Sequence, residues 1–88
     1  MTKHINVKIT GRVQGVGFRW TLYEKFAELG LQGKAENTAD GAVMVDTEGP
    51  EEKLSSLLEW CKVGPTGAKV ENVEVLEMAE PFVPLKNG

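Results

Sequence analysis

The chain has 88 residues, of which 41% are hydrophobic, and its formal net charge is −3. A chain of this length builds one modest core, so we expect a single domain over residues 1–88. It holds one cysteine and one histidine, which excludes an internal disulfide and a structural zinc site of three or four soft ligands. Residues 1–10 lack the unbroken apolar stretch of a signal peptide, and no later run reaches the length of a membrane span. We therefore expect a cytoplasmic protein.

Charge is distributed unevenly along the chain. Residues 1–34 hold six basic and two acidic side chains, whereas residues 35–88 hold four basic and eleven acidic ones. The first part can therefore attract a small anion. Nucleic acids and anionic membranes are held by several convergent cations, so the acidic balance of the whole chain predicts that neither is a partner.

The first two predicted elements are a strand and a helix. Ile5, Val7 and Ile9 alternate with polar residues, a period-two pattern that predicts a strand ended by Gly11. Apolar residues then recur at helical spacing from 18 to 29, and Gly30 follows as a stop signal, which predicts a helix over that range.

A hairpin and a second helix are predicted next. Residues 33–37 and Ala42–Thr47 read as strands on either side of Asp40-Gly41, a strong turn signal. Pro50 then occupies the expected first position of a helix that ends near Gly64. Its apolar residues lie at i, i+3, i+4 and i+7 and are Leu54, Leu57, Leu58 and Cys61.

The last predicted element is a strand over Ala68–Met78. Val70 is out of phase with the later valines, which indicates a bulge or a late start. Residues 81–84 carry two prolines and can add a short edge strand at most. The element order β-α-β-β-α-β predicts an α+β protein with a ferredoxin-like α/β sandwich, an antiparallel sheet with two helices on one face.

The stretch that joins the first strand to the first helix is rich in glycine. It reads GRVQGVGFR over residues 11–19. Glycines here can turn backbone N–H groups to one side beside the positive end of a helix, and Arg19 adds a cation that can grip two phosphate oxygens. The same glycines are also consistent with a tight turn under close helix–sheet packing. The stretch is not a P-loop or a dinucleotide fingerprint, because Gly15-Val16-Gly17 is followed by Phe-Arg-Trp.

These residues resemble the signature of the acylphosphatases. A second segment, residues 33–43, resembles the family's second motif, in which a glycine is followed four residues later by an asparagine, here Asn37, and then by Asp-Gly before a strand. The resemblance extends from residue 5 to about residue 75. It implies hydrolysis of a carboxyl–phosphate anhydride to a carboxylate and inorganic phosphate.

The resemblance also implies roles for particular residues. Arg19 would be the essential phosphate-binding cation, and the side-chain amide of Asn37 would hold the attacking water. Backbone N–H groups of the loop would bind the phosphoryl oxygens; the loop residues are Gln14, Gly15, Val16, Gly17 and Phe18. We expect no metal and no cofactor, a small acyl phosphate as substrate, inorganic phosphate as product and inhibitor, and a monomer.

The match has departures, and other residues need weighing. Lys34 and Ala35 stand where the family commonly has an aromatic residue and a valine, and Leu22 and Phe26 stand where it often has threonine and alanine.

We expect a structural or solvent-facing role for His4 and a core position for Cys61. Trp20 and Tyr23 either stack on an acyl group or pack against the protein, and the glutamates form a solvated strand face (Glu71, Glu74, Glu77 and Glu80).

Two rival functions are compatible with the predicted fold. An RNA-recognition module has the same element order but needs aromatic residues on its third strand, and residues 42–47 contain none. The second rival is a domain that binds a phosphorylated molecule or a protein partner without hydrolysis. An assay of acyl phosphate hydrolysis distinguishes this domain from an enzyme, because only the enzyme releases inorganic phosphate.

Overall fold

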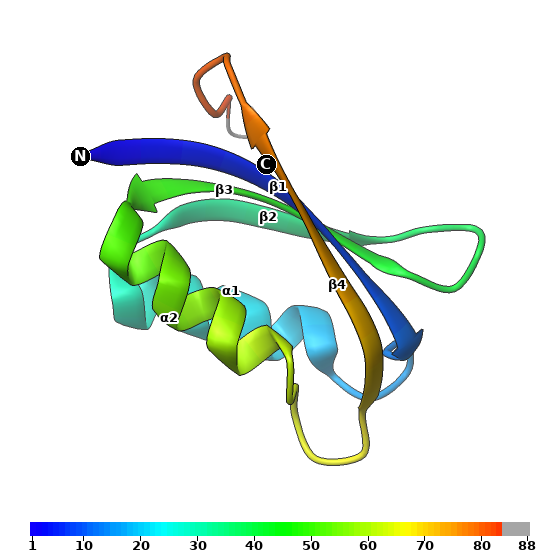
Figure 1. Ribbon diagram of the computed structural model, residues 1–88. Helices are drawn as coiled ribbons and strands as arrows, with labels where there is room; N and C mark the ends of the chain where they lie inside the picture. Colours follow the sequence, from blue (N-terminus) through cyan, green and yellow to red (C-terminus); the bar gives the residue numbers. More distant parts are fainter. Residues whose placement is uncertain (84–88) are drawn as a thin grey trace.

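The computed structural model describes residues 1–83. In chain order the elements are β1 (Thr2–Arg12), α1 (Phe18–Leu29), β2 (Gln32–Asn37), β3 (Val43–Pro50), α2 (Glu51–Cys61) and β4 (Lys69–Met78). The strands form one sheet in the order β2-β3-β1-β4, and every neighbouring pair is antiparallel. Both helices lie on the same face of this sheet (Figure 1). The predicted ferredoxin-like α/β sandwich is confirmed.

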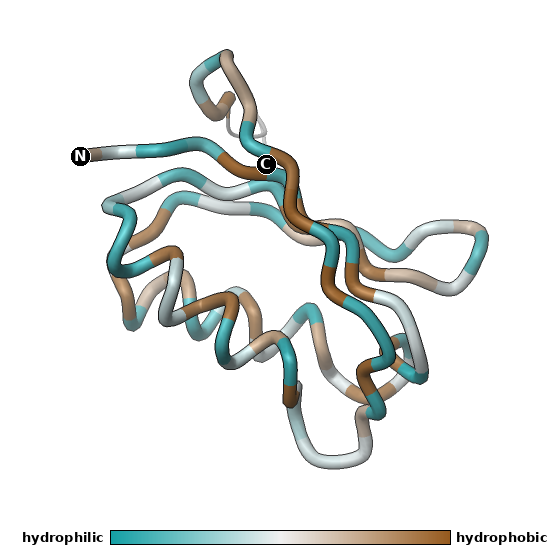
Figure 2. Tube along the Cα trace, in the orientation of Figure 1, coloured by the Kyte–Doolittle hydropathy of each residue, from teal (hydrophilic) through white to brown (hydrophobic). Residues whose placement is uncertain are grey.

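The hydrophobic core lies between the helices and the sheet. Ile5, Val7 and Ile9 of β1 are buried there, and brown and teal alternate along the strands in Figure 2 as the period-two pattern requires. Cys61 is fully buried on the apolar side of α2, as predicted. Burial raises the pKa of its thiol to about 12, so this cysteine is not a nucleophile.

The expectation that Gly11 ends the first strand was wrong. β1 continues to Arg12 and pairs with β4 through a bulge, because Thr10 lies opposite Asn72 while Gly11 lies opposite Val70. Gly11 has φ +124°, and a Cβ on it would lie only 2.2 Å from the carbonyl oxygen of Lys69. Glycine is therefore required by the close approach of two strands, and the bulge predicted from the phase of Val70 is confirmed.

Several other boundaries differ by a few residues. β3 runs over Val43–Pro50 rather than Ala42–Thr47, so Pro50 caps α2 from outside instead of being its first residue. The helix ends at Cys61 rather than near Gly64, because the amides of Val63 and Gly64 both turn back onto the carbonyl group of Trp60. β2 and β4 each begin one residue away from the predicted start.

The chain after β4 turns back over the open face of the sheet. Residues 79–83 form no strand, and Pro84 lies outside the described residues. Phe82 is buried and its ring meets the His4 ring edge-on at a centroid distance of 5.9 Å. His4 is structural rather than solvent-facing: only 8% of it is exposed, and its two ring nitrogens contact the Asp46 carboxylate and the carbonyl oxygen of Glu80.

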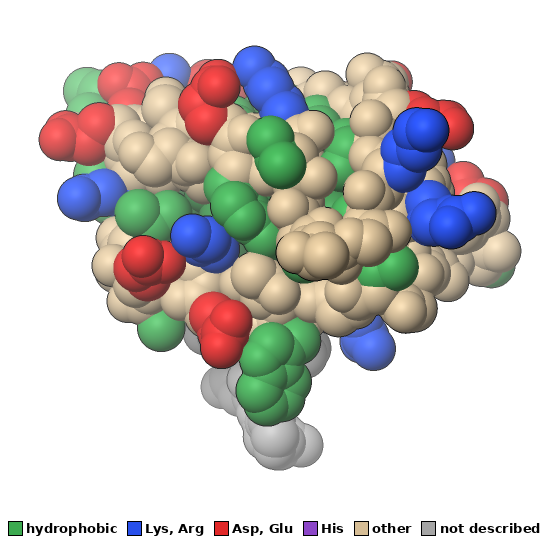
Figure 3. Space-filling model, turned by 90° about the horizontal axis from the view of Figure 1, so that it is seen from below, with side chains coloured by type: hydrophobic (Ala, Val, Ile, Leu, Met, Phe, Trp, Pro, Cys, Tyr) green, Lys and Arg blue, Asp and Glu red, His purple; other side chains and the backbone are tan. Residues whose placement is uncertain are grey.

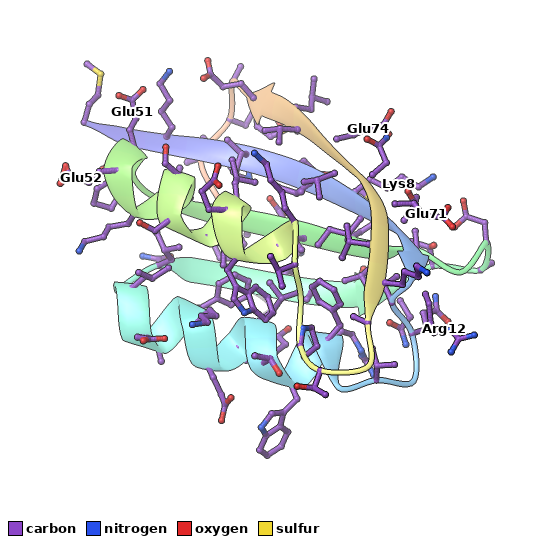
Figure 4. The ribbon with its side chains drawn as sticks, turned by 60° about the horizontal axis from the view of Figure 1, so that its bottom comes forward. Lys8, Arg12, Glu51, Glu52, Glu71 and Glu74 are labelled. Atoms are coloured by element: carbon purple, nitrogen blue, oxygen red, sulfur yellow. The ribbon has the colours of Figure 1, made fainter. Side chains whose placement is uncertain are left out.

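Strand β4 forms one edge of the sheet. The glutamates predicted to form a solvated strand face are exposed, namely Glu71, Glu74, Glu77 and Glu80, but Glu80 lies after the end of β4 rather than on the strand. Figure 4 shows Glu71 and Glu74 projecting from this strand. Negative side chains on an edge strand disfavour pairing with a second strand of the same charge.

Candidate active site

The glycine loop, residues 13–17, connects β1 to α1. It lies at the same end of the molecule as the β2–β3 hairpin turn (Figure 1). Gly15 and Gly17 have φ of 77° and 79°, values that glycine adopts without the strain imposed by a side chain. Gly17 is the N-cap of α1, and its carbonyl oxygen accepts hydrogen bonds from the Thr21 amide (3.1 Å) and hydroxyl (3.0 Å). The loop therefore leads directly into the N-terminus of the helix.

The amide groups of this segment are left without internal acceptors. Within residues 1–83, no backbone carbonyl accepts a hydrogen bond from the N–H groups of residues 14–20. The first N–H groups of any α-helix lack partners in their own helix and carry a partial positive charge. A concave run of such donors is a ready binding site for an anion.

Arg19 and Asn37 lie beside this loop in one shallow pocket of about 260 Å³. Arg19 is on the first turn of α1, and Asn37 is the last residue of β2. Both are exposed. Within the described residues 1–83, no carboxylate pairs with Arg19, so its guanidinium is free to bind an anion.

The structure brings most of the predicted site residues together. The lining of the pocket is Val13, Gly15, Gly17, Phe18, Arg19, Trp20 and Asn37. Phe18 contributes little side-chain surface, because it is only 2% exposed and its ring packs edge-on against Trp60. Gln14 and Val16 are not among the lining residues. Val16 packs against the core, and the Gln14 side chain turns toward the β2–β3 hairpin.

Asn37 is held at the base of a closely bonded turn. The Thr38 amide donates to the Ala42 carbonyl oxygen (2.9 Å), and the Ala42 amide donates to the Thr38 hydroxyl (3.0 Å). The carboxylate of Asp40 accepts from the Thr38 hydroxyl and pairs with Lys8 at 3.0 Å. These two contacts lower the pKa of Asp40 to about 2, so the turn keeps its ion pair over the physiological pH range.

Several cations lie at this end of the molecule. Arg12, Arg19 and Lys69 are exposed, and Figure 3 shows fewer Asp and Glu side chains toward the right-hand end of the helix-bearing face than toward its left-hand end. Figure 4 places Arg12 at the end of β1, whereas Glu51 and Glu52 lie at the opposite end of the molecule on α2. The pocket therefore lies in the part of the molecule where an anion is attracted.

Comparisons with known proteins point to one family. A family model described as Acylphosphatase matches residues 5–82. An acylphosphatase from Caldanaerobacter subterraneus is 47% identical over 84% of this chain and 82% of its own length, and one from Thermus thermophilus is 54% identical over 76% of each. The crystal structure of acylphosphatase from Bacillus subtilis covers 92% of this chain and 89% of its own, with 36% identity and a TM-score of 0.86.

This chain belongs to the acylphosphatase family. The known function of the family is hydrolysis of acyl phosphates, which places the chain among the hydrolases that act on acid anhydrides. The resemblance seen in the two sequence motifs is confirmed. The pocket just described is lined by residues of the first motif and by Asn37 of the second.

Three departures from the acylphosphatase pattern, Leu22, Phe26 and Ala35, lie in the packing behind the pocket, whereas the fourth, Lys34, is only partly buried and lines a different pocket. Leu22 and Phe26 are buried on α1, and the Phe26 ring occupies the space above Gly33, where a Cβ would meet it at 2.7 Å. Ala35 is also buried, and its amide donates to the Tyr23 hydroxyl at 3.0 Å. None of these residues lines the pocket.

The two aromatic residues near Arg19 have different surroundings. Tyr23 packs edge-on against Phe26 at 5.5 Å and closes the outer edge of β2 through its hydroxyl. Trp20 is 74% exposed at the rim of the pocket. The prediction of a packing role therefore describes Tyr23, while Trp20 is placed where an acyl group could meet it.

Two kinds of feature are absent from the described part of the chain. Residues 1–83 contain no group of three or more His, Cys, Asp and Glu side chains that could hold a metal ion. None of the helices within these residues is long and apolar enough to cross a membrane.

Proposed function

We propose that the glycine loop and Arg19 hold the phosphoryl group of a small acyl phosphate, and that Asn37 holds the attacking water. The observation that carries this proposal is the single pocket in which Arg19, Asn37 and the loop meet. Backbone amides of residues 14–18 would bind the phosphoryl oxygens together with the two-pronged guanidinium. Both elements are in place before substrate arrives, so little reorganisation is needed.

The reaction asks little of titratable groups. Water attacks phosphorus, the bond between phosphorus and the carboxylate oxygen breaks, and a carboxylate and inorganic phosphate are released. The leaving carboxylate has a pKa of about 4, so it departs without protonation by a general acid. The Asn37 amide orients the water. Arg19 and the loop amides place positive charge around the negatively charged phosphoryl oxygens, which stabilises the transition state.

We also propose that catalysis needs no metal ion. Arg19 and the loop amides already supply positive charge at the place where Mg²⁺ usually acts in phosphoryl transfer. The test is hydrolysis of benzoyl phosphate by protein treated with EDTA. Undiminished turnover is expected, and turnover that is lost with EDTA and restored by Mg²⁺ would contradict the proposal.

The remaining proposals concern the working form of the protein. One hydrophobic cluster connects the helices and the sheet, which supports one domain over residues 1–88. The exposed glutamates of β4 disfavour edge pairing, which supports a monomer that size-exclusion chromatography with light scattering can test. The free thiol of Cys61 suits a reducing compartment such as the cytoplasm.

The rival of a non-catalytic binding domain makes a different prediction. Such a domain would retain binding of inorganic phosphate and release none from benzoyl phosphate. The presence of Asn37 in the pocket favours the enzyme, because a site that only binds phosphate has no need of a group that positions water.

A further inference from the structure

The side chain of Gln14 connects the glycine loop to the β2–β3 hairpin. Its amide nitrogen Nε2 donates to the carbonyl oxygens of Thr38 (2.8 Å) and Ala42 (2.9 Å). Both acceptors are carbonyl groups, so the orientation of the side-chain amide is unambiguous. Among residues 1–83, no other hydrogen bond joins the loop to residues 37–42.

The two acceptors lie close to Asn37. Thr38 follows it directly in the chain, and Ala42 faces Thr38 across the turn. Each carbonyl also has a donor within the hairpin, since Thr38 accepts from the Gly41 amide (3.2 Å) and Ala42 accepts from the Thr38 amide (2.9 Å). The hairpin is thus closed by its own bonds, and Gln14 adds the connection to the loop.

This connection joins the two halves of the site. The proposed phosphate-binding groups are on the loop and α1, whereas Asn37 is on β2. An in-line attack requires the water and the phosphorus atom to be aligned, and a displacement of about 1 Å can reduce the rate about 100-fold. Gln14 does not line the pocket. Its side chain can therefore affect this alignment only through its hydrogen bonds to the hairpin.

We propose that Gln14 is a positioning residue: its side-chain amide fixes the distance between the phosphate-binding loop and the water-binding Asn37. The inference rests on the proposed function. It differs from the expectation based on family resemblance, in which only the backbone N–H of Gln14 contributes. Substitutions of the side chain keep that N–H, so they separate the two roles.

The test compares two Gln14 variants with a control in the same hairpin. Gln14→Leu removes both donors at similar size, and Gln14→Glu keeps the shape but puts an acceptor against two carbonyl groups. Lys8→Met removes the 3.0 Å ion pair between β1 and Asp40 of the hairpin without touching the loop. The measurements are kcat and KM for benzoyl phosphate, the inhibition constant of inorganic phosphate, and Tm.

Both Gln14 variants should lose at least about tenfold in kcat, because the water is misaligned. Their inhibition constant for phosphate should change by less than about threefold, because the loop amides and Arg19 remain. Lys8→Met should keep kcat within about twofold of the wild type, since it removes only an exposed ion pair.

Two results would overturn the inference. One is a kcat in both Gln14 variants that matches the wild type. The other is a fall in kcat accompanied by an equal weakening of phosphate inhibition, which would mean that the side chain merely supports the loop. Failure of the proposed function looks different: the wild type would not hydrolyse benzoyl phosphate, or Arg19→Ala would remain active.

Discussion

Polar groups near the two ends of strand β1 differ in their pairing: those at the His4 end have partners within the described part of the protein, and those at the glycine-loop end do not. At the first end, the His4 ring is buried and both its nitrogens have acceptors, and Lys3 pairs with Glu51 and Glu77 at 2.8 Å each. At the other end, the loop amides have no backbone acceptor within residues 1–83 and Arg19 has no carboxylate partner there. Polar groups paired within the protein stabilise it, and those left unpaired at the surface can bind a ligand.

The largest expected effect comes from the glycine-loop end of β1, where the polar groups are unpaired within residues 1–83. Arg19→Ala removes the one guanidinium in the pocket, and we expect kcat for benzoyl phosphate to fall by about 10³-fold and phosphate inhibition to weaken strongly. Because Arg19 is exposed, Tm should change little. The matched control is Arg12→Ala, an exposed arginine at the same end that does not line the pocket. An equal loss in both variants would attribute the effect to general positive charge.

Asn37→Ala should have the next largest effect. Loss of the water-holding amide should lower kcat by about 100-fold while the inhibition constant of phosphate stays close to that of the wild type. Asn72→Ala on the exposed edge strand serves as control and should retain full activity. Near-normal turnover by Asn37→Ala would remove this residue from the mechanism.

His4→Asn should change stability and leave activity unaffected, since His4 lies at the end of β1 that is far from the pocket and has its polar groups paired. Two buried hydrogen bonds are disturbed, so we expect a loss of about 1–3 kcal/mol in the free energy of unfolding at pH 6. Urea unfolding monitored by circular dichroism measures it. A matching loss of kcat in the folded variant would contradict the separation of the two ends.

The same variant has a pH dependence of predictable sign. Burial alone would lower the pKa of His4, but contacts with the Glu80 carbonyl group, Asp46 and nearby Glu48 outweigh it and raise the pKa above its ordinary value of 6.5. The charged form is therefore favoured in the folded state. Its contribution is complete below the unfolded pKa and is lost as pH rises through the folded one. The stability advantage of the wild type over His4→Asn should therefore shrink as the pH rises above 6.5 and through the folded pKa, whereas its advantage over the adjacent Lys3→Met should not follow this curve.

Much of the fold could be predicted because it depends on local patterns. Phe18, Leu22 and Phe26 mark the buried side of α1, and the phase of Val70 revealed a bulge that the structure contains. The extent of β1 was missed because Gly11 reads as a strand end. Its role depends on the approach of the Lys69 carbonyl group from the neighbouring strand β4, which lies far from Gly11 in the sequence.

The candidate site was predictable to a similar degree. Arg19 and Asn37 belong to two sequence motifs, and the structure brings them into one pocket. The side-chain role of Gln14 was missed because its partners are backbone carbonyl groups, which every residue carries. The burial of His4 was likewise hidden, since Asp46 and Glu80 lie 42 and 76 positions away in the chain.

The most direct test of the phosphate site is a titration of the wild type with inorganic phosphate in the presence of EDTA. Two-dimensional ¹H–¹⁵N NMR spectra monitor the titration. We expect the largest shifts in the backbone amides of residues 14–19 and in the side-chain amide of Asn37. The Arg19→Ala variant should lose these shifts while its spectrum remains that of a folded protein. Shifts centred on the His4 end of β1, or equal shifts in the wild type and in Arg19→Ala, would contradict the proposed phosphate site.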